Sequence, residues 1–149
     1  MAKKQTVFLI SLLLDLLLLT ACGQDGKVPF IQGTWVVIDH KAPSISAMSE
    51  EEADSWVGKV AQYTKRKASF DGEVCESPTY KPSTMQTEDL WTGFRISPES
   101  LGYKEGPIEV VEVYCGNSEW VTPGSTLIRV GEDRLFTVWD GVFFQLQKR

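Results

Sequence analysis

The sequence predicts a mainly β domain, namely a small antiparallel meander barrel of about eight strands with one or two short helices. Three observations lead to this fold class. Short runs of β-branched and aromatic residues recur between turn residues, Asp140-Gly141 is typical of a two-residue type I′ hairpin, and Ser49-Glu50-Glu51-Glu52 matches a helix-capping box. We therefore expect residues 30–149 to form a single domain.

The first half of this domain is expected to contain one helix and four strands. The segment 34–38 is rich in residues that favour strands, and turn-forming residues bound it on both sides. The capping box predicts a helix that begins after Ser49 and ends near Gly58. The remaining strands are expected over 59–65, over 68–75 with a bend at Asp71-Gly72, and over 79–85.

The second half is expected to contain two very short helix starts and then four strands. The helix starts lie at Thr87 and at Ser97, where Pro98 would take the first helical position. The strands are expected over 108–115, 126–130, 134–139 and 142–148.

The Asp140-Gly141 turn predicts the register of the last two strands, because a two-residue loop allows one pairing. The expected pairs are Trp139 with Val142, Thr137 with Phe144, and Leu135 with Leu146. These six side chains point to one side and form a predicted core. A tight turn at Glu132-Asp133 would pair Val130 with Leu135 and place Ile128 on the same side.

The opposite face of this hairpin carries Phe136, Val138 and Phe143, although a solvated strand face is mostly polar. We expect a helix or loop, such as residues 49–58, to cover these side chains. The alternative is an exposed patch that marks the surface for a protein partner.

The first residues have the organisation of a secretory signal peptide. Lys3 and Lys4 precede an apolar run over 7–19, which is shorter than the ~20 residues of a membrane-spanning helix. Leu19-Thr20-Ala21-Cys22 resembles the lipobox of bacterial lipoproteins, in which the cysteine is lipidated and becomes the first residue of the mature chain. The resemblance implies a signal peptide over 1–21 and a lipidated tether over 22–29.

The lipoprotein resemblance also implies a location. Gly23 stands where an aspartate tends to retain Gram-negative lipoproteins in the inner membrane, so the implied place is the bacterial envelope, at the outer membrane facing the periplasm. Residues 23–29 reach roughly 25 Å when extended, at about 3.5 Å per residue, and would hold the domain near the bilayer.

The chain is acidic, with 15 basic and 20 acidic residues and a formal net charge of −5. Lys3, Lys4 and Asp15 would leave with the signal peptide, and the charge would become −6. Phosphate backbones repel such a domain, and we expect no nucleic-acid partner. Anionic headgroups repel it too, so membrane attachment would depend on the acyl chains.

Two cysteines remain beside Cys22, and an even number in an oxidising compartment predicts a disulfide between Cys75 and Cys115. This disulfide would close a loop between residues 40 positions apart and stabilise the fold by about 4 kcal/mol. The alternative is a pair of buried free thiols. The cysteine and histidine spacing fits no zinc motif, and we expect no metal and no cofactor.

The sequence contains no motif of a common catalytic class, and we predict no catalytic residue and no enzymatic activity. His40 is the only histidine, and Asp39 would point to the opposite strand face, so we expect a surface histidine. Glu112 shares a strand face with Val110 and Tyr114. It is either a buried carboxyl with a raised pKa or a residue at the rim of the sheet.

Five tryptophans are many for a small domain, and aromatic side chains both build cores and bind ligands. Trp35 and Trp139 lie inside expected strands and are predicted core residues; together with Glu112 they are also candidate ligand contacts. Trp91 and Trp120 lie in turn-rich stretches. If a tryptophan contacts a ligand outside the core, we expect it to be one of these two.

Gly33-Thr34-Trp35 resembles the Gly-x-Trp motif that begins the barrels of lipocalins and calycins. The resemblance implies a cup-shaped domain that binds a small apolar molecule. It also implies that Trp35 closes one end of the barrel and that an arginine near the end of the chain packs on it (Arg129, Arg134 or Arg149). We therefore expect a non-catalytic envelope lipoprotein that binds a small apolar or lipid-like ligand. The alternative is a protein-binding inhibitor or immunity factor against an envelope hydrolase, since many wall hydrolases are basic.

Overall fold

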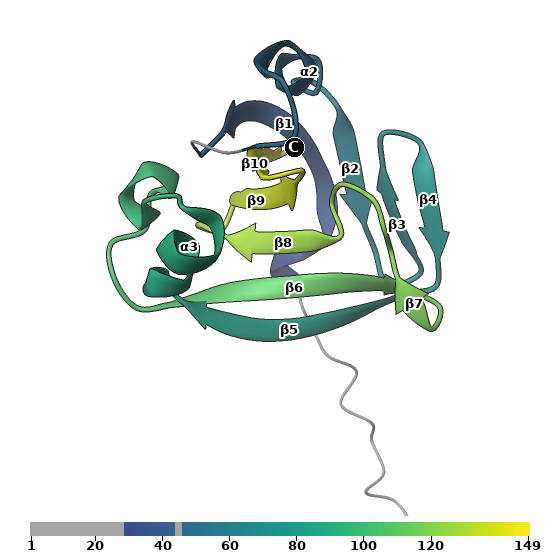
Figure 1. The fold of residues 1–149 in the computed structure, drawn as a ribbon. Helices are drawn as coiled ribbons and strands as arrows, with labels where there is room; N and C mark the ends of the chain where they lie inside the picture. The colour runs from purple at the N-terminus through teal and green to yellow at the C-terminus, as the bar shows by residue number, and fades with distance from the viewer. Residues whose placement is uncertain (1–28, 44–45) are drawn as a thin grey trace, which may run out of the picture.

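The computed structural model describes residues 29–43 and 46–149, so the expected signal peptide, Cys22 and nearly all of the tether lie outside the described residues. Within the described part, no helix is long and apolar enough to cross a membrane. This part of the chain is mainly β, as predicted, and its strands form one curled antiparallel sheet (Figure 1).

The strands are β1 (Gly33–Lys41), β2 (Val60–Tyr63), β3 (Lys67–Phe70), β4 (Glu73–Glu76), β5 (Pro78–Gln86), β6 (Pro107–Cys115), β7 (Ser118–Glu119), β8 (Thr126–Arg129), β9 (Arg134–Trp139) and β10 (Val142–Lys148). The α-helices are α2 (Glu50–Asp54) and α3 (Thr87–Phe94), and the 3₁₀ helices are η2 (Pro29–Ile31) and η3 (Pro98–Leu101).

The sheet is a meander whose first and last strands pair. Its order is β4-β3-β2-β1-β10-β9-β8-β6-β5, with β7 beside β6. Strands that follow one another in sequence are neighbours, apart from the breaks between β4 and β5 and between β7 and β8, and β1 joins β10. The sheet therefore curls into a half-barrel that is open at one seam, which agrees with the predicted meander barrel.

The open seam is bridged by side chains. The predicted disulfide is present between Cys75 of β4 and Cys115 of β6. The Tyr80 hydroxyl on β5 donates a hydrogen bond to the Thr64 carbonyl oxygen at 2.7 Å. These two links hold the seam although β4 and β5 are the edges of the sheet.

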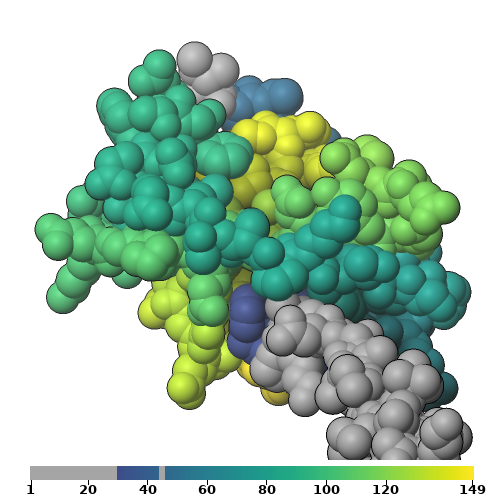
Figure 2. Space-filling view, turned by 90° about the horizontal axis from the view of Figure 1, so that it is seen from below, coloured from purple at the N-terminus to yellow at the C-terminus, as the bar shows by residue number. Residues whose placement is uncertain are grey.

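The edge strand β5 is mostly exposed and crosses the face that Figure 2 shows from below, between the α3 segment and β7. Pro78 and Pro82 lie within β5. Proline has no N–H to offer to a further strand, so it is tolerated at a sheet edge and protects that edge from unwanted pairing.

The register predicted for the last hairpin is confirmed, with Trp139 opposite Val142, Thr137 opposite Phe144, and Leu135 opposite Leu146. Asp140 and Gly141 have φ angles of 49° and 81°, and two positive φ angles are what a type I′ turn requires. The next turn differs from its prediction, because Leu135 pairs with Arg129 rather than with Val130. Ile128 therefore lies on the opposite face from Leu135.

Two further expectations need correction. The strand expected over 68–75 is a hairpin of β3 and β4, because Asp71 and Gly72 have φ angles of 47° and 94° and make a tight turn rather than a bend. The helix expected to reach Gly58 is α2, which ends at Asp54. Its start is as predicted, since the Ser49 hydroxyl accepts a hydrogen bond from the Glu52 amide.

The interior of the half-barrel, which we call the main core, is filled by side chains. Trp35, Tyr63 and Phe144 are fully buried, and Phe70 is 2% exposed. The Trp35 indole donates to the Ile31 carbonyl oxygen at 2.8 Å, and the ammonium of Lys148 lies 5.3 Å from its ring centre. A lysine thus takes the place in which the lipocalin resemblance implied an arginine.

A second cluster, the outer core, covers the other face of the last hairpin. Phe136 and Phe143 are 2% and 0% exposed, and Val138 packs against the same cluster. The cover comes from the segment of α3 and η3, which contributes Leu90 and other apolar residues, and not from residues 49–58. The alternative of an exposed partner patch at Phe136, Val138 and Phe143 is therefore wrong, because these side chains complete a core.

Gly124 shows how tightly the main core is packed, and it yields a prediction. Its φ is +89°, and an added Cβ atom would lie 2.6 Å from the Tyr63 hydroxyl oxygen and 2.9 Å from Phe70. We expect Gly124→Ala to lower the free energy of unfolding by about 2 to 5 kcal/mol, from backbone strain and overpacking together. Urea unfolding followed by tryptophan fluorescence measures the change.

Gly131→Ala is the matched control, because an added Cβ at Gly131 meets nothing within 4 Å. This variant should stay within about 1 kcal/mol of the native protein. Equal stability of the two variants would show that the interior is looser than the contacts around Gly124 indicate.

Candidate functional site

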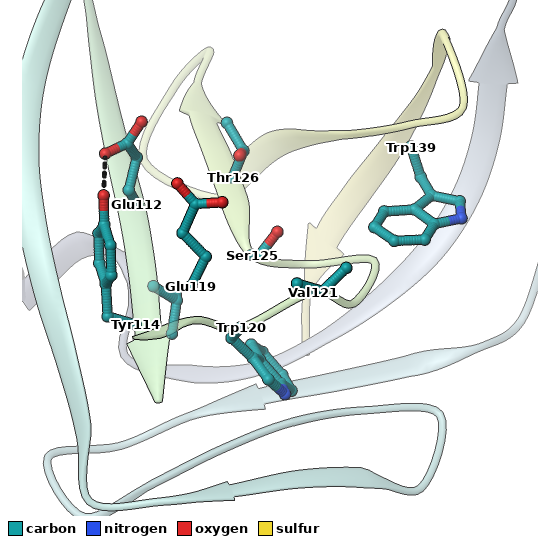
Figure 3. A pocket seen from close by; sticks show the side chains of 9 residues that line it. Glu112, Tyr114, Glu119, Trp120, Val121, Ser125, Thr126 and Trp139 are labelled. Atoms are coloured by element: carbon teal, nitrogen blue, oxygen red, sulfur yellow. Dashed lines mark hydrogen bonds between the residues drawn. The ribbon is translucent and has the colours of Figure 1, made fainter. Parts of the chain in front are cut away.

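Two of the candidate residues, Glu112 and Trp139, line one surface hollow of about 290 Å³, which we call the acidic hollow (Figure 3). The third candidate, Trp35, lies in the main core away from the surface. The hollow is lined by Glu112, Val113, Tyr114, Glu119, Trp120, Val121, Ser125, Thr126 and Trp139.

The register of β6 positions one wall of the hollow. Side chains of a strand alternate between faces, so Glu112 and Tyr114 share one face. Glu112 pairs with Thr126 of β8, and Tyr114 pairs with Glu119 of β7. Because β7 and β8 adjoin β6 on the same side, these residues converge although they come from three strands.

The loop between β7 and β8 and the end of β9 form the rest of the wall. Val121 is 79% exposed, whereas the neighbouring Trp120 is 8% exposed and packs with the main core. Figure 3 shows the Trp120 ring pointing away from the two carboxylates and Trp139 lying across the hollow from them. Trp139 is half-buried and presents an aromatic surface to the opening.

The hollow is negatively charged. Glu112 and Glu119 are both exposed, and no lysine, arginine or histidine belongs to its lining. The Tyr114 hydroxyl donates to a Glu112 oxygen at 3.1 Å. This hydrogen bond, with the nearby carboxylates, raises the pKa of Tyr114, because the anionic phenolate would lose the bond and be repelled.

One cation lies beside the hollow. The Lys81 ammonium is 3.8 Å from the centre of the Tyr114 ring, and Lys81 pairs with Glu112 across β5 and β6. Neither Glu112 nor Glu119 belongs to an ion pair among the described residues. Both carboxylates therefore remain available to a cationic group of a partner.

These positions decide between the alternatives left by the sequence. Glu112 is exposed and is not a buried carboxyl, although it lies on β6 between β5 and β8 and not at an edge of the sheet. Sequence reasoning did not single out Glu119 or Ser125, because their place beside Glu112 depends on pairing between strands that local patterns do not reveal. Of the two tryptophans expected to meet a ligand, Trp120 lines the hollow, and Trp91 is 54% exposed on α3.

His40 differs from the expected surface histidine, since its side chain is 9% exposed. Its Nε2 atom lies 2.8 Å from an Asp54 carboxylate oxygen. The register of β1 against β10 shifts between Val37 and Asp39, which marks a bulge, and the alternation of faces slips there by one residue. His40 consequently faces inward, opposite Phe144.

Comparisons with known proteins identify no relative, because no protein-family model, no curated protein and no solved structure matches this chain. The resemblances to bacterial lipoproteins and to lipocalins therefore stay predictions from the sequence. The function has to be argued from the geometry and charge of the sites.

The hydrogen bond between Tyr114 and Glu112 yields a second prediction. Replacement of Glu112 by glutamine removes the negative charge that disfavours the phenolate, so the pKa of Tyr114 should fall toward its ordinary value of 10.0. The chemical shift of the Tyr114 ring carbon attached to oxygen, followed by NMR against pH, measures this.

Glu109→Gln provides the control, because Glu109 lies on β6 but pairs with Arg129 instead. This variant should leave the pKa of Tyr114 unchanged. If Glu112→Gln also left it unchanged, the two side chains would not be bonded in solution.

Proposed function

We propose that this chain is a non-catalytic, lipid-anchored protein of the bacterial envelope that binds a basic protein partner in the acidic hollow, as an inhibitor or immunity factor against an envelope hydrolase. The observation that carries the proposal is the pair of exposed carboxylates, Glu112 and Glu119, beside the aromatic surface of Trp139. This combination suits an arginine or lysine side chain, which bonds to carboxylates and also packs on aromatic faces.

The shape of the hollow favours a side chain on the surface of a protein over a free small molecule. It is an open depression, and Val121 stands exposed at its border as an apolar contact for the partner. A buried apolar anchor beside charged groups is a common arrangement at protein interfaces. The acidic chain as a whole would also speed its encounter with a basic partner.

The main core gives less support to the small apolar ligand that the lipocalin resemblance implies. Trp35, Tyr63 and Phe144 fill the interior where such a ligand would lie, and each is fully buried. A ligand of ordinary size needs a pocket of about 300 Å³ or more, mostly apolar and well enclosed. Binding in the interior would require these aromatic side chains to move out.

The location rests on the lipobox resemblance at Cys22 and on the apolar run before it. Two or more acyl chains would anchor the protein stably, and the short tether would keep the acidic hollow close to the membrane. A hydrolase that acts on the cell wall works in the same compartment. The anchor and the binding site would thus place an inhibitor where its target acts.

The binding proposal is tested with purified basic muramidases of the lysozyme type as partners. We expect the native chain to bind one of them and to slow its hydrolysis of cell walls. Glu112→Gln with Glu119→Gln should weaken that binding by about tenfold or more, because two close charge contacts are lost. Isothermal titration and an inhibition assay at two salt concentrations provide the measurements.

Glu51→Gln with Glu52→Gln is the matched control, because it removes the same charge from exposed positions of α2. Its affinity should stay close to that of the native chain. The proposal fails if no basic muramidase is bound, or if both double variants weaken binding equally and only net charge matters.

Membrane attachment is tested separately by Cys22→Ser, which removes the sulfur that would carry the lipid. We expect the native chain in the membrane fraction of a Gram-negative host, with a mass that shows acylation, and the variant without acyl chains. Fractionation and mass spectrometry of the intact protein measure this. An unmodified Cys22 with the leader still attached would contradict the lipid anchor and leave the binding proposal untouched.

A further inference from the structure

His40, Glu50 and Asp54 form a cluster that the acidic hollow does not include. One ligand atom from each residue, namely an imidazole nitrogen and two carboxylate oxygens, lies within 4.8 Å of the others. The cluster joins the end of β1 to α2, which lies at the top of the molecule in Figure 1. The three residues span fifteen positions of the sequence and come together only in the fold.

The fold fixes the imidazole of His40 in one orientation. The bulge in β1 turns His40 inward opposite Phe144, and the two rings lie 6.2 Å apart. Its side chain is 9% exposed, so packing restricts the ring, and its Nε2 atom points to Asp54 at 2.8 Å. The nitrogen donor is therefore held in place before any ion arrives, which lowers the entropy cost of binding.

The helix α2 presents the two carboxylates together. Glu50 and Asp54 are four residues apart, so they lie on the same face of the helical turn. Ser49 caps the helix through its bond to the Glu52 amide, which fixes where the turn begins. Both carboxylates are exposed, and Glu50 has the freedom to rotate toward His40 and Asp54.

We propose that His40, Glu50 and Asp54 bind a divalent transition-metal ion of the zinc class. Zinc takes imidazole nitrogen and carboxylate oxygen at about 2.0–2.2 Å, which sets tetrahedral ligands about 3.4 Å apart. The observed 2.8 Å between His40 and Asp54 would open slightly, and Glu50, whose ligand atom lies within 4.8 Å of the other two, would move closer by rotation of its side chain. Two carboxylates and a neutral imidazole balance the charge of the ion.

The donor set selects among cations. Calcium and magnesium prefer sites built from oxygen atoms alone, so the imidazole nitrogen disfavours both ions. An imidazole with carboxylates suits zinc and its neighbours in the transition series. Three protein ligands leave a fourth position for water or for a group on another molecule. The bound ion would tie α2 to β1 and stabilise the fold by mass action.

A simple ion pair is the competing interpretation, and Glu50 distinguishes the two. The contact between His40 and Asp54 accounts for a hydrogen bond without any metal. Glu50, in contrast, makes no hydrogen bond to the other two among the described residues, so the ion pair gives it no part, whereas a bound ion would make it a third ligand. A role for Glu50 in zinc binding is therefore the decisive observation.

The test uses the full chain without a polyhistidine tag, in detergent, titrated with Zn²⁺ and separately with Ca²⁺ and Mg²⁺. His40 is the only histidine, so its ring resonances in NMR report on this site alone. We expect Zn²⁺ to shift them saturably with one ion per chain, and Ca²⁺ and Mg²⁺ to leave them unchanged. Titration calorimetry gives the affinity.

The variants decide which side chains hold the ion. His40→Gln should abolish binding at this site, and Glu50→Gln should weaken it by about tenfold or more, since one of three ligands is lost. Glu51→Gln, one position away on α2, should bind as the native chain does. An unshifted His40 resonance in excess Zn²⁺, or equal affinity of Glu50→Gln and the native chain, would overturn the proposal.

Discussion

The pairing of β1 with β10 joins the two ends of the domain, and the rest of the sheet depends on it. Trp35 pairs with Lys148 and Val37 with Leu146, so the first strand completes the meander beside the last. Without these hydrogen bonds, β1 to β4 would be a separate sheet, and both β1 and β10 would have an unpaired edge. The pairing also brings Trp35 and Phe144 into one interior, which closes the main core from both halves of the chain.

Local rules predicted the parts of the fold that local geometry decides. Asp140-Gly141 predicted both the turn and the pairs of the last hairpin, because a type I′ turn leaves no freedom of register. The same dipeptide signal at Asp71-Gly72 makes a hairpin too, so the expectation of a single bent strand over 68–75 gives this signal too little weight. The turn before β9 is one residue longer than expected, because the Val130 and Gly131 amides both donate to the Arg134 carbonyl oxygen and the turn accommodates an extra residue.

The sites were predicted less completely than the fold, because they depend on contacts distant in sequence. Glu112 and Trp139 are singled out separately for their residue types, and only the pairing of β6 with β8 and of β8 with β9 brings them to one hollow. His40 was placed on the surface by the period of two that a regular strand follows. The bulge after Val37 breaks that period, and no residue pattern in β1 marks its position.

A filled interior has a consequence for how this domain binds anything. Because aromatic side chains occupy the half-barrel, the free energy of binding has to come from contacts at the surface. Charged groups there are partly solvated, so each contact contributes less free energy than a contact in a buried pocket would. Rigidity compensates in part, because a surface that is fixed before the encounter loses little conformational entropy. Cys115 follows Tyr114 directly, and its disulfide to Cys75 fixes the end of β6 at the acidic hollow. The link that bridges the open seam of the sheet thus also holds one wall of the proposed binding site in place.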